Sequence, residues 1–177
     1  HLDKYGSMRE YITDKENIFK YQKRSDVLVL NYDNDVTRKM SKRTQSKVIW
    51  FSNKKHLPRW VPLEKVALQG EHNLSNALAA AQAAEAAGVS RVHIMDALKT
   101  FRGLPNRLQF VRTVRGVQYY NDTTATTPDA TIAALKTLGK ASRNKKQETR
   151  NIILICGGAD KKLEYREMAK YIKKYRL

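Results

Sequence analysis

Three clusters of polar residues have types and spacing that could bind a ligand, and in two of them the ligand would be an anion. The first is Y-Y-N-D-T-T-A-T-T-P at 119–128, which runs from a predicted strand through a polar loop into a predicted helix. In α/β proteins, the free N–H groups at such a helix N-terminus attract anions. Asp122 suits a ribose hydroxyl or a metal-bound phosphate, and Thr126 adds a hydroxyl. An ordinary turn with Asp and Thr caps fits the same residues equally well.

The second cluster is G-G-A-D-K-K at 157–162, again after a predicted buried strand. Its glycines let the backbone approach a ligand closely, and Lys161 could neutralise a carboxylate or a phosphate. A tight turn with solvated lysines is the alternative. The third is G-E-H-N at 70–73, where Asn73 and Asn76 lie one turn apart at a helix start and could face one ligand. Taken alone, Asn73 is more simply a helix cap.

Other catalytic patterns are weak. His1 and Asp3 form only a His-x-Asp pair, and the sequence has no G-x-x-x-x-G-K-S/T loop for phosphates and no Ser/His/Asp or Cys/His arrangement. Cys156 lies in a predicted buried strand, where a cysteine is usually an inert part of the core. A single cysteine excludes an intrachain disulfide framework and fits a reducing cytosol, so we expect a cytoplasmic protein.

Alternating strands and helices are predicted to position these clusters. Continuous apolar runs at 26–31, 47–52 and 151–156 are typical of buried parallel strands, and 110–121 alternates like a β-hairpin. Helices are predicted at 7–21, at 35–43, from Asn73 to Gly88, from Ser90 to Phe101, from 127 to about 140, and from about 163 onward. We therefore expect an α/β fold with parallel sheets.

The charge is strongly positive, with 34 Lys and Arg against 17 Asp and Glu, a net charge of +17. Nucleic-acid binders share this property, but here the basic residues are spread out and lack regularly interleaved aromatics that could stack on bases. We expect solvated surface charge and no nucleic-acid partner. No apolar run approaches the roughly 20 residues of a membrane span, so we also expect no membrane partner.

Seven segments, taken in chain order, resemble the Mur ligase family of peptidoglycan synthesis. They are H-L-D-K-Y at 1–5, the helix at 11–15, V-L-N with its acidic loop at 29–31, G-E-H-N-L-S-N at 70–76, F-R-G-L-P-N-R at 101–107, N-D-T-T-A-T at 121–126 and G-G-A-D-K at 157–161. Each segment alone is modest, but seven in the family's order across nearly the whole chain are a strong match. The D-glutamate-adding members resemble this chain best.

The resemblance implies a three-domain enzyme. Residues 1–102 would be the second half of a P-loop-type central ATPase domain, and residues 103–177 the first half of a Rossmann-like C-terminal domain. The UDP-substrate domain, the P-loop and the final segment would lie outside this chain, which alone is expected to be inactive. The complete enzyme is expected to be a monomer.

The implied reaction is ATP-dependent amide formation. ATP phosphorylates the carboxylate of UDP-N-acetylmuramoyl-L-alanine, and the amine of D-glutamate then displaces phosphate. Two Mg²⁺ ions would stabilise the charge leaving the γ-phosphate. The site residues implied by the resemblance are His1 as a magnesium ligand, Lys15 as a carbamylated lysine that helps hold the second magnesium, Asn73 and Asn76 on the adenine side, Arg107 and Asp122 as nucleotide partners, and Thr126 and Lys161 at the D-glutamate carboxylates.

Two positions depart from the family pattern. Thr124 stands where the D-glutamate enzymes often have a Lys, and Asn106 stands where a His usually precedes the linker Arg. Two other functions remain open: an amide ligase of the folylpolyglutamate synthase type, and a basic α/β module that binds nucleic acid without catalysis.

Overall fold

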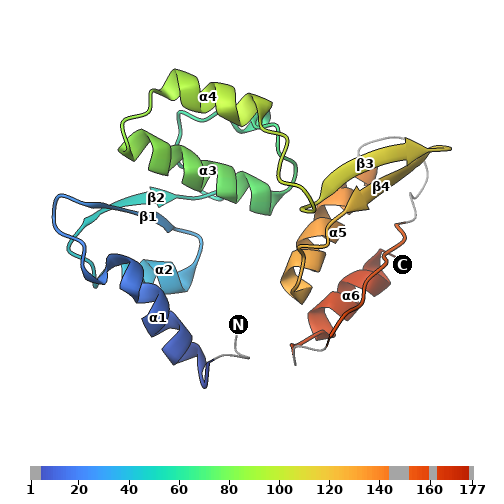
Figure 1. Cartoon of the computed structure of the whole chain (residues 1–177), viewed down its shortest axis with the longest axis horizontal. Helices are drawn as coiled ribbons and strands as arrows, with labels where there is room; N and C mark the ends of the chain where they lie inside the picture. Colours follow the sequence, from blue (N-terminus) through green and yellow to red (C-terminus); the bar gives the residue numbers. More distant parts are fainter. Residues whose placement is uncertain (1–4, 144–151, 160–162, 176–177) are drawn as a thin grey trace. The chain divides into compact units, whose positions relative to one another are not determined.

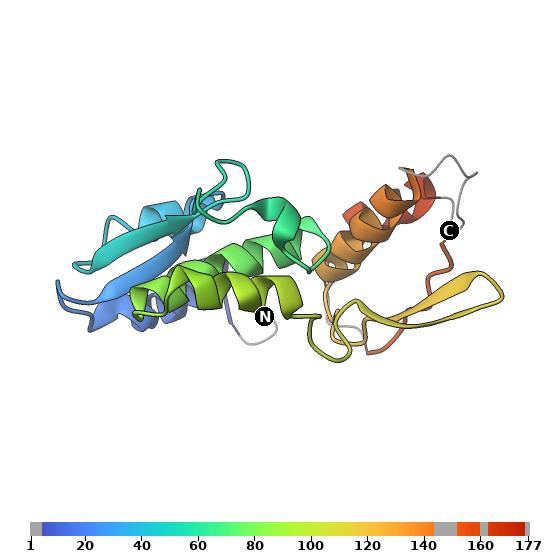
Figure 2. The ribbon, with the colours of Figure 1, turned by 90° about the horizontal axis from the view of Figure 1, so that it is seen from above.

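The computed structural model describes residues 5–143, 152–159 and 163–175. The chain divides into two compact units (Figures 1 and 2). Unit 1 comprises residues 1–68 and 72–101, and unit 2 comprises residues 69–71 and 102–177. No helix in the described part of the chain is long and apolar enough to cross a membrane.

The centre of unit 1 is a parallel pair of strands, β1 (Val27–Asn31) and β2 (Lys47–Phe51). Helix α2 (Asp35–Met40) connects them, and α1 (Met8–Lys20) precedes β1. These four elements share a core of Phe19, Leu28, Leu30 and Met40, with Ile12, Val36, Val48 and Trp50 packed around it. The predicted parallel strands and both helices are therefore confirmed.

A helical hairpin completes unit 1. The helices α3 (Glu71–Ala86) and α4 (Arg91–Thr100) lie side by side (Figure 1), and their core of Leu78, Ala81 and Ile94 includes Val61 from the loop near the short 3₁₀ helix η1 (Leu63–Lys65). The side chain of Gln82 donates to the carbonyl of Trp50 at 2.9 Å and ties α3 to β2. The two predicted helices are confirmed, but Asn73 is not a cap, because the first of them begins at Glu71.

Unit 2 begins with an antiparallel hairpin of β3 (Gln109–Val114) and β4 (Val117–Asn121). Its turn residues Arg115 and Gly116 both have positive φ angles, of 49° and 82°, as tight hairpin turns require. The helices α5 (Pro128–Arg143) and α6 (Arg166–Lys174) pack together, and Pro128 occupies the first helical position, where proline is favoured.

The predicted buried strand at 151–156 is wrong for the residues that the structure describes. Residues 152–159 have no regular structure, Ile153 is 84% and Ile155 is 94% exposed, and Cys156 is exposed rather than in the core. An apolar run becomes a buried strand only when a neighbouring strand satisfies its backbone and other layers cover its side chains. In the described part of unit 2, β3 and β4 pair with each other, and neither strand pairs with residues 152–159.

Candidate functional site

The structure describes six of the eight predicted site residues, and His1 and Lys161 lie outside the described residues. Arg107, Asp122 and Thr126 belong to unit 2, and Lys15, Asn73 and Asn76 belong to unit 1.

Two loops of unit 2 hold the first three residues. The carboxylate of Asp122 accepts a hydrogen bond of 2.8 Å from the backbone N–H of Leu108, the residue directly after Arg107. This hydrogen bond joins two residues that are 14 positions apart in the sequence, so Arg107 and Asp122 lie on adjoining loops. Arg107 is exposed, and the structure gives its guanidinium no partner among the described residues. A cation and a carboxylate on adjoining loops suit a ligand with both phosphate and hydroxyl groups.

The two departures from the family pattern touch each other in this arrangement. Thr124 donates from its hydroxyl at 2.8 Å and from its backbone N–H at 3.1 Å to the carbonyl of Asn106. Asn106 has a φ of 63°, a left-handed conformation that Asn tolerates better than most residues, and its side-chain oxygen accepts from Asn121 at 2.9 Å. These bonds hold the loop that carries Arg107 against the loop that carries Asp122.

Thr126 lies just before α5. Thr127 precedes the helix, and its hydroxyl accepts from the backbone N–H of Ala130 at 3.4 Å. Thr126 is exposed, and no hydrogen bond of its hydroxyl is found in the part of the chain that the structure describes. A free hydroxyl next to the positive end of a 16-residue helix is suited to an anionic group.

In unit 1, the predicted residues come from two helices. Lys15 is exposed on α1, and its ammonium lies 5.4 Å from the centroid of the Tyr11 ring. On α3, Asn73 is buried and Asn76 is exposed, so the two amides are in different surroundings although they are one turn apart.

A carboxylate that sequence reasoning did not select lies at the carboxyl edge of the β1–β2 sheet. Asp33 follows β1 and accepts hydrogen bonds from the hydroxyl of Ser52 at 2.6 Å and the N–H of Asn53 at 2.9 Å, both directly after β2. Burial opposes ionisation of Asp33, but the hydrogen bonds from Ser52, Lys54 and Asn53 outweigh it and hold the pKa below its ordinary value of 3.8. The available signal was an acid two residues after a buried parallel strand.

Tyr32 lies beside Asp33 at the same edge. The Lys55 ammonium donates to the Tyr32 hydroxyl at 3.0 Å and lies 4.1 Å from the ring centroid. This hydrogen bond lowers the pKa of Tyr32. The carboxyl edge therefore carries both a fixed anion and a fixed cation, and it is the edge at which open α/β sheets bind ligands.

Of the two residues expected at a metal ion, His1 lies outside the described residues and Lys15 lies on α1. The residues that the structure describes contain no group of three or more His, Cys, Asp or Glu suited to a metal. Lys15 is a cationic amine, which magnesium does not accept as a ligand, whereas its carbamate would supply the oxygen ligands that magnesium prefers. The exposure of Lys15 on α1 leaves room for that modification.

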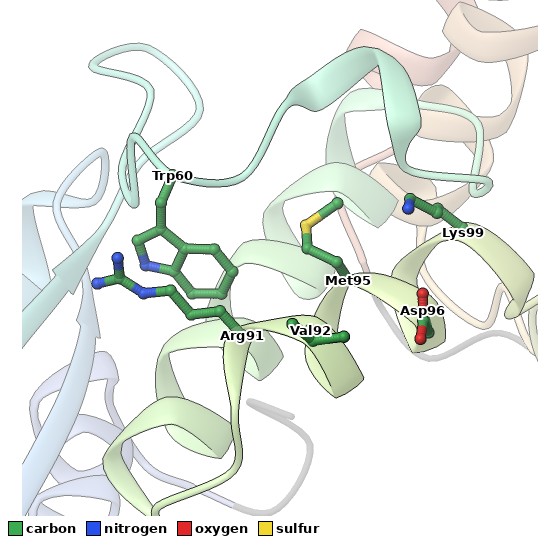
Figure 3. Close-up of a pocket in the computed structure, with 6 residues that line it drawn as sticks. All are labelled: Trp60, Arg91, Val92, Met95, Asp96 and Lys99. Carbon is green, nitrogen blue, oxygen red and sulfur yellow. The ribbon is translucent and has the colours of Figure 1, made fainter.

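An open pocket of about 290 Å³ in unit 1 contains none of the predicted residues (Figure 3). It is lined by Trp60, Arg91, Val92, Met95, Asp96 and Lys99. The Trp60 indole donates to Glu85 at 3.1 Å, and Arg91 pairs with the same carboxylate at 2.6 Å. Glu85 thus satisfies the indole of Trp60 and the guanidinium of Arg91, which indicates a structural role for these two lining residues.

Comparison with known proteins gives two family matches. The Mur ligase middle domain matches residues 1–63, and the Mur ligase glutamate ligase domain matches residues 106–176. Similar curated proteins named UDP-N-acetylmuramoylalanine--D-glutamate ligase come from Acidobacterium capsulatum (35% identity, 95% of this chain and 39% of the relative), Clostridium novyi (37%, 96% and 38%) and Roseiflexus sp. (36%, 97% and 41%). The chain therefore spans about two fifths of the length of these relatives.

A solved structure has a similar fold. The MurF protein from Acinetobacter baumannii matches 79% of this chain and 35% of its own length, with a TM-score of 0.65 and 21% identity. This likeness supports the mixed α/β architecture, and the two matched domains together cover most of the chain. The chain belongs to the Mur ligase family.

Proposed function

We propose that the gene product carrying this chain is a cytoplasmic, ATP-dependent ligase that adds D-glutamate to UDP-N-acetylmuramoyl-L-alanine. The observation that carries the proposal is the 35–37% identity to ligases of that name along 95–97% of the chain. We assign residues 1–102 to the central domain and residues 103–177 to the C-terminal domain. Because the chain spans about two fifths of these relatives, the proposal concerns the longer protein.

The proposed reaction has two steps. An oxygen of the alanyl carboxylate attacks the γ-phosphorus of ATP, which gives an acyl phosphate and ADP. The amine of D-glutamate then attacks the acyl carbon, the carbon–oxygen bond to the phosphate breaks, and an amide and inorganic phosphate are released. Positioning and charge neutralisation are the protein's main contributions to such a reaction.

The loop pair of unit 2 supports the assignment of nucleotide contacts to Arg107 and Asp122. One Asp122 oxygen accepts from the Leu108 N–H, and the other oxygen of the carboxylate could accept from a hydroxyl such as that of a ribose. The exposed Arg107 guanidinium provides donors for phosphate oxygens. We assign Asn73 and Asn76 to the adenine side.

The remaining residues would serve the acidic reactants. We propose that Thr126 and Lys161 bind the carboxylates of D-glutamate, through a hydroxyl next to a helix N-terminus and through a cationic amine. When bound, magnesium would stabilise the charge of the phosphates. His1 and the carbamate of Lys15 would hold it.

The test is phosphate release by the purified natural gene product with ATP, Mg²⁺ and UDP-N-acetylmuramoyl-L-alanine. We expect release that depends on D-glutamate, with the amide product confirmed by mass spectrometry. L-glutamate is the matched control because only the configuration differs. Turnover with L-glutamate and a folate instead would favour the folylpolyglutamate synthase type, and the absence of any ligase turnover would refute the proposal.

A further inference from the structure

The amino edge of the unit 1 sheet carries a dense cluster of cations. The turn at 21–26 precedes β1 and the turn at 41–46 precedes β2, so in this parallel pair both turns lie at one edge, opposite Asp33 and Ser52. We define the basic rim as the seven exposed residues Lys20, Lys23, Arg24, Lys39, Lys42, Arg43 and Lys47.

Hydrogen bonds hold the two turns together. The Lys47 N–H donates to the carbonyl of Asp26 at 2.9 Å, and the Ser46 hydroxyl donates to the side chain of Gln22 at 2.8 Å. Arg43 pairs with Glu16 of α1 at 2.7 Å. The cations of the basic rim therefore belong to one surface, although they are spread over 28 positions of the sequence.

Helix dipoles and neighbouring acids balance only part of the positive charge of the basic rim. Lys20 and Lys39 lie in the last turns of α1 and α2, where they complement the helix dipoles, but the other five cations lie beyond the helices. Two acids lie among them. Glu16 pairs with Arg43, and the Asp26 carboxylate accepts from the backbone N–H of Lys23 at 2.7 Å and the hydroxyl of Ser25. A large positive excess remains.

Two large apolar side chains adjoin the basic rim. Ile18 is 74% exposed and Tyr21 is 80% exposed, one helical turn apart, and the Lys20 ammonium lies 5.5 Å from the Tyr21 ring centroid. Exposed aliphatic and aromatic groups surrounded by lysines are typical of surfaces that rest on anionic lipid headgroups. A nucleic acid would bind the cations through its phosphates. An exposed isoleucine would add nothing to that binding, because it has neither a charge nor an aromatic ring on which a base could stack.

We propose that the basic rim, with Ile18 and Tyr21 as shallow apolar anchors, binds an anionic lipid surface peripherally. The carboxyl edge of the sheet, with Asp33 and Ser52, is at the opposite end of the strands and stays open to water. The sequence-based expectation of no membrane partner rested on the lack of a spanning segment, which a peripheral contact does not need. The proposal is independent of the ligase reaction.

The test is cosedimentation of the natural gene product with vesicles of phosphatidylcholine containing about 30% phosphatidylglycerol, compared with pure phosphatidylcholine. We expect binding to the anionic vesicles only, weakened as NaCl rises from about 0.05 to 0.5 M. The variant Lys23→Glu/Arg24→Glu/Lys42→Glu should bind at least about tenfold more weakly. Its matched control is Lys65→Glu/Lys99→Glu/Arg112→Glu, which changes the net charge equally at exposed positions elsewhere.

A second variant separates lipid from nucleic acid. Ile18→Ser/Tyr21→Ser should weaken vesicle binding and leave binding to an arbitrary DNA duplex unchanged. Thermal unfolding at the wild-type temperature would show that the variants are folded. A Tyr21→Trp substitution reports the contact directly, because its fluorescence emission should shift to the blue with anionic vesicles. Equal losses in the two triple variants, equal binding to both vesicle types, or binding to duplex alone would overturn the proposal.

Discussion

Asp33 shows how one carboxylate can fix the edge of a sheet. It joins the turn after β1 to the loop after β2 through Ser52 and Asn53. Because the pKa of Asp33 is lowered in the folded chain, its ionised form favours folding above the ordinary value of 3.8 that the group has in the unfolded chain. That contribution is lost as the pH falls below this value and through the lower folded pKa.

We expect Asp33→Asn to lower the free energy of unfolding by about 1–3 kcal/mol at neutral pH. The difference from the wild type should shrink as the pH falls below about 4. Urea unfolding followed by tryptophan fluorescence measures this, since Trp50 and Trp60 both lie in unit 1. Asp35→Asn is the control, because Asp35 is exposed and pairs only with Arg38 among the described residues. Equal effects of the two substitutions would contradict this account.

Lys15 is assigned a role that needs a modified side chain. In the natural gene product, Lys15→Ala should strongly reduce turnover, and small carboxylates such as acetate should partly restore it by replacing the carbamate oxygens. Steady-state kinetics with and without added carboxylate measures this effect. Asn17→Ala, at another exposed position of α1, is the control. Unchanged activity of Lys15→Ala would remove Lys15 from the site.

Lys161 is assigned to the incoming amino acid. Lys161→Ala in the same protein should raise the KM for D-glutamate far more than the KM for ATP, because only the amino acid would lose its cationic partner. Lys162→Ala, which removes the neighbouring lysine, is the matched control. A comparable rise in both KM values would exclude a specific role at the D-glutamate site.

At the scale of the elements, periodicity and turn residues predicted most of the fold. The parallel strands, the hairpin around Arg115 and Gly116, and the Pro128 helix start follow from local chemistry. The failure at residues 152–156 has a different cause, since an apolar run forms a strand only if other segments pair with it. The hydrogen bond between Asp122 and Leu108 could not be predicted from the sequence either, because it depends on how two loops pack against each other.

The packing of α5 on α6 depends on one small residue. A Cβ added at Gly139 would lie 2.2 Å from Cε1 of Tyr175. Alanine normally gains about 1 kcal/mol over glycine inside a helix, but this overlap should cost about 1–3 kcal/mol. We therefore expect Gly139→Ala to destabilise unit 2 in denaturant unfolding followed by circular dichroism at 222 nm. With Tyr175→Ala in the background, the same substitution should be neutral or stabilising. A loss of the same size in both backgrounds would argue against this contact.

At the scale of the whole molecule, the two units differ in how much apolar surface they bury. The two hydrophobic clusters found among the described residues, one around Phe19 and Leu28 and one around Leu78, belong to unit 1. Among the described residues, unit 2 buries the large apolar side chains Ile132 and Leu135, whereas both units expose several others. The larger buried set belongs to unit 1, and it comprises Phe19, Leu28, Leu30, Met40, Val61, Leu78 and Ile94. Since buried apolar area is the main favourable term in folding, unit 2 should be the less stable unit.

The expected consequence is that the 177-residue chain does not unfold in a single step. Circular dichroism at 222 nm reports helices of both units, whereas fluorescence of Trp50 and Trp60 reports unit 1 alone. In a urea titration, the dichroism should begin to fall at a lower urea concentration than the fluorescence, because α5 and α6 unfold first. Leu78→Ala, which removes a fully buried side chain of unit 1, should shift the fluorescence transition by about 2–5 kcal/mol and leave the early dichroism phase in place. Coincident curves would mean that the two units unfold as one, and the difference in buried apolar surface would then not govern their stability.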